Sequence, residues 1–393
     1  MKRAVRVLFL AHDIGLRGGV GTFSYELAEA LIKRGVELLV VARHSASPVD
    51  ENIRAHVREL HSPDVPPRDV SFYLSNARVI TEAVRRFRPD VIHDSSGGLG
   101  FLPWLSRYAP VVTTVHGSPL LDDLRVRYGS FRDWLRLRLY QYSHRIPSNL
   151  LNLFEKADIR RAVFVSKTCL ADTLTRLEPG ARELLRAKST VIYNGLSSER
   201  VREVTGPNGD CNGHDVVFMG RLAEYKGVDR LIRAFSLVSR ELRDAKLHVV
   251  GSGPDADKLK TLSNRLGVEK RVIFHGWLQR DQALKILASS ALLAHPSLYE
   301  SFGYVIVEAY ALGKPVIAHR APYSRELVEE MGAGLTVNTF DEEEFSKALL
   351  ALLTDSDLYK RFSSKARKVA EEVFDVRVTA DKYVKVYEDV QEV

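Results

Sequence analysis

Two glutamates, Glu300 and Glu308, stand on either side of a glycine in the segment SLYESFGYVIVEAYALGKPVIAH, residues 297–319. Carboxylates at such spacing can bind a metal ion, exchange protons with a substrate, or cap a helix. A third carboxylate, Glu326, follows shortly after the segment. The residue types around Gly303 therefore favour a metal site, a hydrolase or a plain helix start, and all three stay open at this point.

Two cations stand close together in GRLAEYKGVDRL, residues 220–231. Arg221 ends an apolar run, and Lys226 precedes Gly227 and a segment with helical periodicity. An arginine fork and a lysine point charge at a strand tip can together hold a diphosphate. A solvated basic loop has the same composition, and on residue types alone it is the better interpretation.

Glycines cluster between a first apolar run and a helical pattern in GLRGGVGTFSYELAEAL, residues 15–31. Gly18, Gly19 and Gly21 would let the backbone approach a ligand, and a helix start offers N–H groups to an anion. No Gly-Lys-Ser/Thr follows, which excludes a Walker A loop. A tight turn explains these glycines equally well.

The segment VVGSGPDADKL, residues 249–259, imitates the G-x-G-x-x-A fingerprint of dinucleotide-binding turns. That fingerprint requires an acid at the end of the next strand, and the next apolar run ends at His275 instead. The acids after Pro254 are also usual at the start of a helix. We therefore favour a structural role for Gly251 and Gly253, with a nicotinamide-dependent enzyme as an alternative.

A histidine, His116, stands at the end of the apolar run VVTTVHGS, next to Gly117. An imidazole at a strand tip can contact or position a substrate, and a hydrogen-bonded structural histidine is the competing interpretation. His93 and Asp94 end an equivalent run, but no spacing links the two histidines and an acid into a metal-ligand set. We predict no metal in the active site.

The bulk composition is that of a folded, water-soluble protein. The chain has 393 residues, with 45% hydrophobic and 27% charged, which is enough for two domains. No run of about 18 apolar residues is present, and the basic-then-apolar start lacks a signal-peptide cleavage site. Two cysteines, Cys169 and Cys211, are too few for a disulfide framework. These features predict a cytoplasmic protein.

The formal net charge of +7 suits anionic partners such as phosphates, acidic lipids or nucleic acid. Residues 129–146, GSFRDWLRLRLYQYSHRI, interleave arginines with aromatic and aliphatic residues. This is the pattern of a basic amphipathic helix, which either packs on its own domain or makes a peripheral contact with the inner face of a membrane.

Short apolar runs that alternate with helical segments must position these residues. The runs predicted as strands are 5–12, 36–43, 89–95, 110–117, 161–168 and 189–195, then 215–221, 246–253, 271–277, 291–297, 315–320 and 333–338. Continuous Val/Ile/Leu strands separated by helices indicate parallel sheets covered on both faces. The polar segment 196–215 reads as a linker, and the tail from about 340 as helical. The fold class is therefore α/β, with two Rossmann-like doubly wound domains.

A series of motifs follows along the chain: the Gly-rich strand tips, VHGS, VFVSK, VIYNG, GRLAEYKG, VVGSGP and HPSLYESFGYVIVEAYALGKPVIAH. In this order, the motifs resemble those of the retaining, nucleotide-sugar-dependent glycosyltransferases of family four. The resemblance extends from about residue 5 to 375 and is strongest over 215–330. It implies a GT-B fold, in which two Rossmann-like domains face each other across a cleft that holds the donor. The implied boundaries are 1–196 for the acceptor domain and 197–375 for the donor domain, with helix 376–393 packed back on the first.

The resemblance also assigns roles to the residues singled out above. Arg221 and Lys226 should hold the donor diphosphate, while the turn at Gly18 and Gly19 approaches it from the other domain. His116 matches the histidine that contacts the transferred sugar.

Glu300 and Glu308 match the two glutamates of the family's E-x7-E motif. By this match Glu308 should accept hydrogen bonds from the ribose hydroxyls, and Glu300 should face the donor sugar. Backbone N–H groups around Phe302 and Gly303 should receive the phosphate, and the backbone at Leu278 should read the base.

The sequence departs from the family pattern at two places. Ser301 stands where a glycine is usual, and Arg320, Ala321 and Pro322 replace a Gly-Gly turn that normally touches the donor sugar.

The implied reaction transfers a sugar from a UDP-, GDP- or ADP-sugar to a hydroxyl acceptor, such as a lipid-linked or soluble glycan. It retains the anomeric configuration by front-face attack and needs no metal or other cofactor. Nucleic acid is not expected as a partner. A non-catalytic sugar-nucleotide binder is the second alternative.

Overall fold

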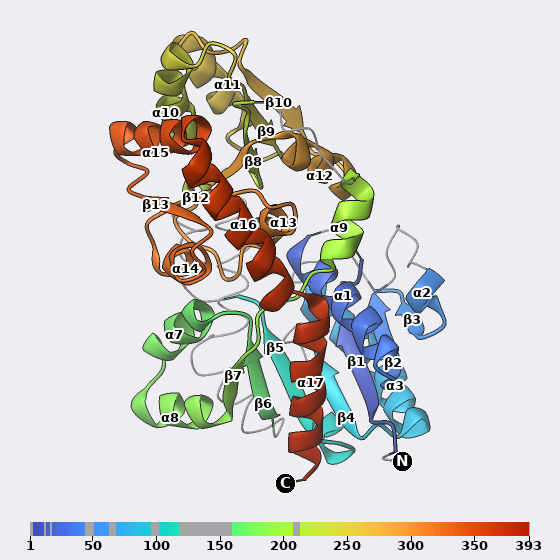
Figure 1. Cartoon of the computed structure of the whole chain (residues 1–393). Helices are drawn as coiled ribbons and strands as arrows, with labels where there is room; N and C mark the ends of the chain where they lie inside the picture. The colour runs from blue at the N-terminus through green and yellow to red at the C-terminus, as the bar shows by residue number, and fades with distance from the viewer. Residues whose placement is uncertain are drawn as a thin grey trace. The chain divides into compact units, whose positions relative to one another are not determined.

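The computed structural model describes residues 3–11, 13–15, 18–43, 51–62, 68–95, 102–117, 159–206 and 213–392. The basic segment 129–146 lies outside these residues, as does Cys211. The described chain divides into two compact units (Figure 1). Unit 1 contains the described residues up to Gly195 together with those from Val376 onward, and unit 2 contains Leu196–Asp375.

Unit 1 is built on a parallel sheet with the described strand order β3-β2-β1-β4-β5-β6-β7. Its strands are β1 (Arg6–Ala11), β2 (Glu37–Arg43), β3 (Val57–Leu60), β4 (Val91–Asp94), β5 (Val111–Val115), β6 (Ile159–Phe164) and β7 (Ser189–Val191). Its helices are α1 (Gly19–Lys33), α2 (Glu51–Arg54), α3 (Arg68–Phe87), η2 (Pro103–Arg107), α7 (Lys167–Thr175), α8 (Pro179–Lys188) and α17 (Val376–Gln391). Strand β1 is fully buried from Val7 to Ala11, as expected for a central strand covered on both faces.

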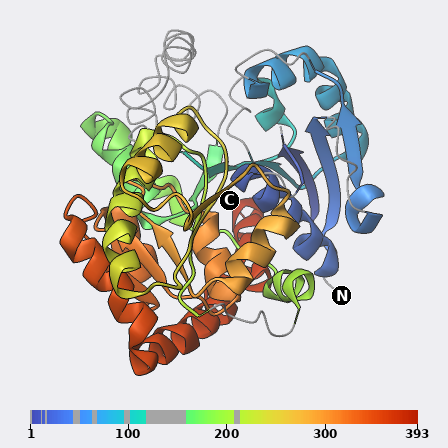
Figure 2. The same ribbon diagram turned by 90° about the horizontal axis from the view of Figure 1, so that it is seen from above.

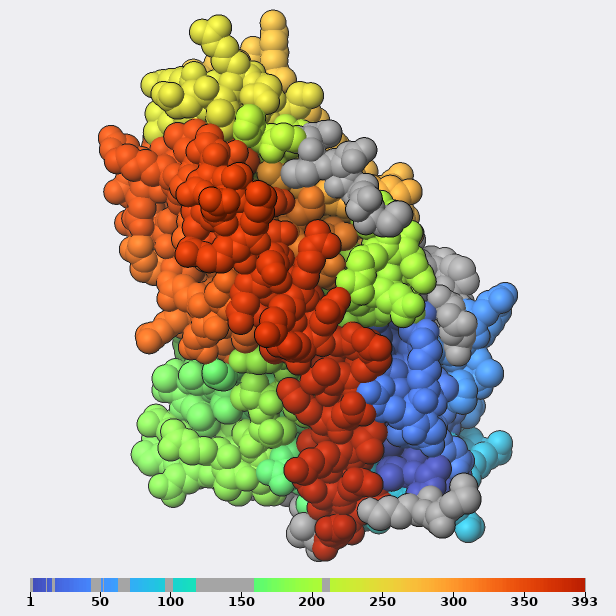
Figure 3. Space-filling view, viewed as in Figure 1, coloured from blue at the N-terminus to red at the C-terminus, as the bar shows by residue number. Residues whose placement is uncertain are grey.

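Helix α17 packs against α1, β4 and β6 of unit 1 and joins the end of the described chain to the first sheet. In the space-filling view, its red surface lies beside the blue surface of α1 (Figure 3). Buried tyrosines on α17 reach polar groups of the sheet: Tyr387 is hydrogen-bonded to His93 at 2.6 Å and Tyr383 to Thr114 at 2.8 Å. His93, predicted at a strand tip, is thus a fully buried structural residue.

Unit 2 repeats the architecture with the strand order β10-β9-β8-β11-β12-β13. Its strands are β8 (Val216–Met219), β9 (Leu247–Val250), β10 (Val272–Gly276), β11 (Leu292–His295), β12 (Val316–His319) and β13 (Gly334–Val337). Its helices are α9 (Ser198–Thr205), η3 (Glu224–Lys226), α10 (Val228–Glu241), α11 (Ala256–Arg265), α12 (Arg280–Ser289), α13 (Tyr304–Ala311), α14 (Pro322–Ser324), η4 (Arg325–Glu329), α15 (Glu342–Thr354) and α16 (Ser356–Glu372). Seen from above, the yellow helices α10 and α11 lie on one side of this sheet and the orange helices α12 and α13 on the other (Figure 2).

All twelve predicted strands are confirmed, and so is the helical tail. The carboxyl ends of the strands in each unit share one edge of the sheet, because every pair of neighbouring strands is parallel. Parallel α/β sheets bind their ligands at that edge.

Two elements were not predicted. Helix α9 forms inside the segment interpreted as a linker, where the Ser197 side chain accepts a hydrogen bond from the backbone N–H of Arg200 and Val201 is fully buried. This helix packs against α12 and α13, and its buried residues are Ser198 and Val201. Within the described residues, strand β3 pairs with β2 alone and lies at the edge of the sheet, where natural strands are often very short and carry charged residues.

Candidate active site

The tips of β8 and β9 approach each other too closely for side chains. A Cβ on Gly251 would lie 1.9 Å from the carbonyl oxygen of Gly220, and one on Gly253 would lie 2.2 Å from that of Leu222. These close backbone contacts explain why glycine is needed at both positions without any bound dinucleotide, in agreement with the structural role favoured for Gly251 and Gly253 from the sequence. They also fix the loop that carries Arg221, whose side chain is exposed.

The loop that carries Lys226 is joined to the loop after β11. The backbone N–H of Leu298 donates to the carbonyl oxygen of Tyr225 at 2.9 Å. Gly227 has a φ of +72°, and a Cβ there would come within 2.6 Å of the Pro296 carbonyl oxygen. Glycine is therefore required at this position for both its backbone conformation and its close contact.

Glu300 lies at the centre of a buried polar cluster. Its Oε1 accepts hydrogen bonds from Lys226 Nζ and, at 2.9 Å, from His295 Nε2. Only 13% of the Lys226 and Glu300 side chains is exposed, and only 2% of His295. Burial raises the pKa of the Glu300 carboxyl, but the Lys226 ammonium and the His295 hydrogen bond outweigh it and hold that pKa well below its usual value. The structure thus brings together Lys226 and Glu300, two residues predicted separately.

Tyr323 stabilises the loop that carries this cluster. Its fully buried hydroxyl donates to the carbonyl oxygens of Ser297 at 2.8 Å and His295 at 3.3 Å. Burial, with the Glu300 charge, raises the pKa of Tyr323 well above its usual value, so the phenol stays a neutral donor. Tyr323 lies directly after the sequence that replaces the family's Gly-Gly turn, and Arg320 from that sequence pairs with Glu344 at 2.5 Å.

Helix α13 begins directly after Gly303, as predicted. Gly303 adopts a φ of +78° and accepts a hydrogen bond at its carbonyl oxygen from the N–H of Ile306 at 2.9 Å. Phe302, just before it, is 4% exposed and packs edge-to-face against Tyr304. The first N–H groups of a helix have no partners within that helix and carry a partial positive charge, which favours an anion nearby.

Glu308, within α13, pairs with a residue that the sequence did not single out. Arg280 Nε donates to Glu308 Oε1 at 2.8 Å, and both side chains are about nine-tenths buried, with 11% and 10% exposed. Arg280 is the first residue of α12, two positions after Leu278. Leu278 itself is half-buried in the short connection after β10.

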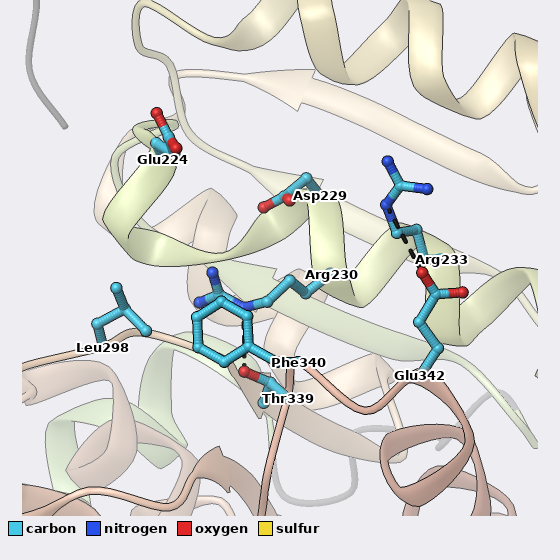
Figure 4. A pocket seen from close by; sticks show the side chains of 8 residues that line it. All are labelled: Glu224, Asp229, Arg230, Arg233, Leu298, Thr339, Phe340 and Glu342. Carbon is cyan, nitrogen blue, oxygen red and sulfur yellow. Dashed lines mark hydrogen bonds and ion pairs between the residues drawn. The ribbon is translucent and has the colours of Figure 1, made fainter.

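A cavity of about 290 Å³ opens beside the Lys226 loop (Figure 4). Its lining residues are Glu224, Asp229, Arg230, Arg233, Leu298, Thr339, Phe340 and Glu342. The Arg230 guanidinium lies 4.5 Å from the centre of the Phe340 ring and donates to Thr339 Oγ1 at 3.0 Å and to the Pro296 carbonyl oxygen at 2.7 Å. Arg230 thereby ties α10 to the loop that precedes Glu300.

Unit 1 contains the remaining predicted site residues. Gly18, with a φ of +84°, caps α1, which begins at Gly19. His116 packs edge-to-face on Phe23 of α1, with ring centres 4.6 Å apart. The buried Cys169 thiol donates to the carbonyl oxygen of Gly117 at 3.3 Å and so fixes the residue after His116.

The described residues contain no group of three or more His, Cys, Asp or Glu side chains placed to hold a metal ion. Glu326, the third carboxylate near Gly303 in the sequence, is buried in η4 with 3% exposed. No helix in the described parts of the chain is long and apolar enough to cross a membrane.

Comparison with known proteins identifies the family. Residues 17–200 match the model described as Glycosyltransferase Family 4, and residues 205–369 match Glycosyl transferases group 1. The chain belongs to glycosyltransferase family four. The match of both halves confirms the resemblance inferred from the ordered motifs.

Relatives of this family-four glycosyltransferase span nearly its whole length. It is 24% identical to the alpha-D-kanosaminyltransferase of Streptomyces kanamyceticus, over 87% of this chain and 91% of that protein. It is 26% identical to the lipopolysaccharide core biosynthesis glycosyltransferase LpsE of Rhizobium meliloti, over 94% of this chain and 96% of that protein.

Among solved structures, the chain resembles Anabaena HepE in complex with UDP and glucose, with a TM-score of 0.71 and 22% identity over 98% of this chain and 100% of that chain. This likeness confirms the predicted GT-B fold class of two Rossmann-like domains. The protein is a sugar-transferring enzyme of the GT-B type.

Proposed function

We propose that this glycosyltransferase moves a sugar from a nucleoside diphosphate sugar to a hydroxyl acceptor with retention of anomeric configuration. The observation that carries the proposal is the pair of buried carboxylates, Glu300 just before α13 and Glu308 within it, each hydrogen-bonded to a cation. The UDP and UDP-glucose complexes of Anabaena HepE support a nucleotide sugar as the donor.

In this proposal the donor diphosphate binds to Arg221, Lys226 and the N–H groups around Phe302 and Gly303. An exposed guanidinium, a mostly buried ammonium and a helix start together supply the positive charge that a diphosphate requires.

Hydroxyl recognition falls to the carboxylates. Glu308 accepts hydrogen bonds from the ribose, and Glu300 faces the donor sugar. The backbone at Leu278, next to α12, contacts the base. In unit 1, the approach of the Gly18–Gly19 turn to the diphosphate and the contact of His116 with the sugar stay predictions.

The reaction breaks the bond between the anomeric carbon and the diphosphate oxygen and forms a bond from the acceptor oxygen on the same face of the sugar. The acceptor proton passes to the released phosphate oxygen. Arg221 and Lys226 stabilise the negative charge that develops on the leaving group, which is commonly the largest catalytic contribution. We assign Glu300 no role as a nucleophile, because its Oε1 already accepts hydrogen bonds from Lys226 and His295. The positive charge that Arg221, Lys226 and the helix N–H groups offer the diphosphate supports a reaction that proceeds without a divalent ion.

A lipid-linked or soluble glycan is the proposed acceptor. LpsE, which acts in lipopolysaccharide core biosynthesis, supports a glycan acceptor. The predicted membrane contact through 129–146 falls outside the described residues.

The test is a transfer and hydrolysis screen of UDP-, GDP- and ADP-sugars with the purified chain, with and without EDTA. We expect turnover of one donor class, unchanged by EDTA, and a product whose anomeric proton coupling in NMR matches that of the donor. An inverted product, or activity abolished by EDTA and restored by a divalent ion, would refute the corresponding part of the proposal.

A further inference from the structure

Arg280 is placed where a cation is unfavourable for its own helix. It is the first residue of α12, and the partial positive charge of a helix N-terminus favours acids there, such as the neighbouring Asp281. The start of the helix is fixed independently by the capping pair of Gln279 and Gln282. The position of Arg280 in α12 therefore gives no helix-stabilising reason for a cation.

The cation instead serves α13. Arg280 Nε donates to Glu308 Oε1 at 2.8 Å, and the guanidinium and carboxylate are both about nine-tenths buried. A carboxylate has two oxygens, and a donor that holds one of them fixes the direction of the other. We propose that Arg280 is the positioning residue that orients Glu308 for recognition of the donor's ribose hydroxyls.

This inference rests on the proposed function, since it needs Glu308 to meet a ribose. Without Arg280, a buried carboxylate loses its charged partner, and the side chain has to rotate or attract water. Ribose recognition should then weaken, while contacts of the diphosphate with Arg221 and Lys226 stay intact. Arg280 is thus a specificity-determining position that acts through another residue.

A double-mutant cycle, in which the protein loses Arg280 and the nucleotide loses one ribose hydroxyl, separates a positioning role of Arg280 from a general structural role. Calorimetry on the full chain first identifies which of UDP, GDP and ADP binds, and then measures that nucleotide beside its 2′-deoxy and 3′-deoxy forms. In the wild type, at least one deoxy form should bind about 10- to 100-fold more weakly, as expected for a hydrogen bond to a charged group.

In Arg280→Gln, the affinity for the ribonucleotide should fall to about the wild-type affinity for that deoxy form. The affinity for the deoxy form itself should change less than about twofold between wild type and variant. Arg280→Lys, which has no Nε–H and a shorter reach, should narrow the ribo-to-deoxy ratio by about threefold or more. The matched control is Arg202→Gln, which removes a 3.0 Å ion pair to Glu371 from the same unit. It should leave the ratio unchanged.

A ribo-to-deoxy ratio that is unchanged in either Arg280 variant would overturn the inference, and so would a wild type that does not discriminate the deoxy forms. If the wild type bound none of the three nucleotides, the proposed function itself would fail. The lysine variant keeps the test decisive where Arg280→Gln does not fold.

Discussion

Lys226 is shared between two anions in the proposed reaction, Glu300 within the protein and the diphosphate of the donor. The ion pair holds the ammonium at the edge of the sheet before any ligand is present. Such preorganisation lowers the reorganisation needed when charge develops on the leaving group.

Replacing Lys226 with alanine should therefore lower kcat on the order of 10²- to 10³-fold, as removal of one charge-stabilising donor does in other enzymes. Steady-state kinetics with the donor found in the screen measures this effect. The control is Lys258→Ala, whose side chain is 81% exposed, and it should be neutral. Equal rates in the two variants would remove Lys226 from the catalytic site.

The Glu300 carboxyl makes stability depend on pH. Its pKa in the folded protein lies below the ordinary value of 4.5, so the unfolded chain takes up the proton first as the pH falls. The stabilisation is therefore complete above about pH 5.5 and is lost as the pH falls below about 4.5. Chemical denaturation of the wild type and Glu300→Gln should show a free-energy difference that is constant in the first range and shrinks in the second. A difference that grows on acidification contradicts this account.

At the residue scale, sequence reasoning could select Lys226, Glu300 and Glu308, because their spacing follows a motif. It missed His295 and Arg280, since their contacts depend on which strands and helices are neighbours in unit 2. The signal for His295 was present: it ends an apolar run, as His116 does. Treating every histidine at the end of a predicted strand as a candidate site residue would have identified His295.

At the scale of the elements, α17 is hydrogen-bonded to a buried histidine, His93. Burial, with a smaller effect of the His116 charge, lowers the pKa of His93 to about 3 from an ordinary value of 6.5. Between these two values the unfolded chain binds a proton that the folded protein does not, so this residue makes stability fall as the pH falls from 6.5 to 3.

Replacement of His93 by glutamine should remove that dependence. Within the window, the free energy of unfolding of the wild type should fall by up to about 1.4 kcal/mol per pH unit more steeply than that of the variant. Urea titrations across the window measure both slopes, and the slope is independent of any constant cost of the substitution. Parallel slopes would mean that His93 titrates normally.

The contact between the β8 and β9 tips predicts a sharp steric effect. Gly253→Ala should destabilise unit 2 by about 1–3 kcal/mol, because its Cβ meets backbone that cannot move aside cheaply. It should also weaken nucleotide binding, since the displaced loop carries Arg221. Gly180→Ala, with no atom within 4 Å of the added Cβ, is the control and should not destabilise. Thermal unfolding and calorimetry of both variants provide the comparison.

Element by element, the long buried strands could be predicted because continuous Val/Ile/Leu runs have few other uses. Helix α9 could not, since its burial depends on Ser198 and Val201 and on neighbours from α12 and α13. The Gly251–Gly253 turn shows the opposite case. Its pattern matches a ligand-binding motif, yet close backbone packing is sufficient to explain it.

For the whole molecule, each unit has its own sheet and its own buried core, and the proposed nucleotide contacts with Arg221, Lys226, Leu278 and Glu308 all lie in unit 2. A free nucleotide concentration of about 100 times the Kd should stabilise the folded, nucleotide-binding state relative to the unfolded state by about 2.7 kcal/mol. Hydrogen exchange should therefore show the strongest protection in segments 220–227, 276–280 and 300–308. Protection confined to unit 1 would contradict the assignment of the donor to unit 2.

The return of α17 to unit 1 also affects the order of synthesis and folding. The described residues of unit 2 form one uninterrupted stretch apart from the gap at 207–212, whereas unit 1 needs residues from before and after that stretch. A ribosome therefore exposes every strand of the second sheet before it exposes Tyr383 and Tyr387, whose hydroxyls bond to Thr114 and His93 of the first sheet. Unit 1 therefore cannot complete its folding until α17 has been synthesised, and until then His93 and the surface of α1 stay uncovered. Chaperone binding during translation should concentrate on these residues.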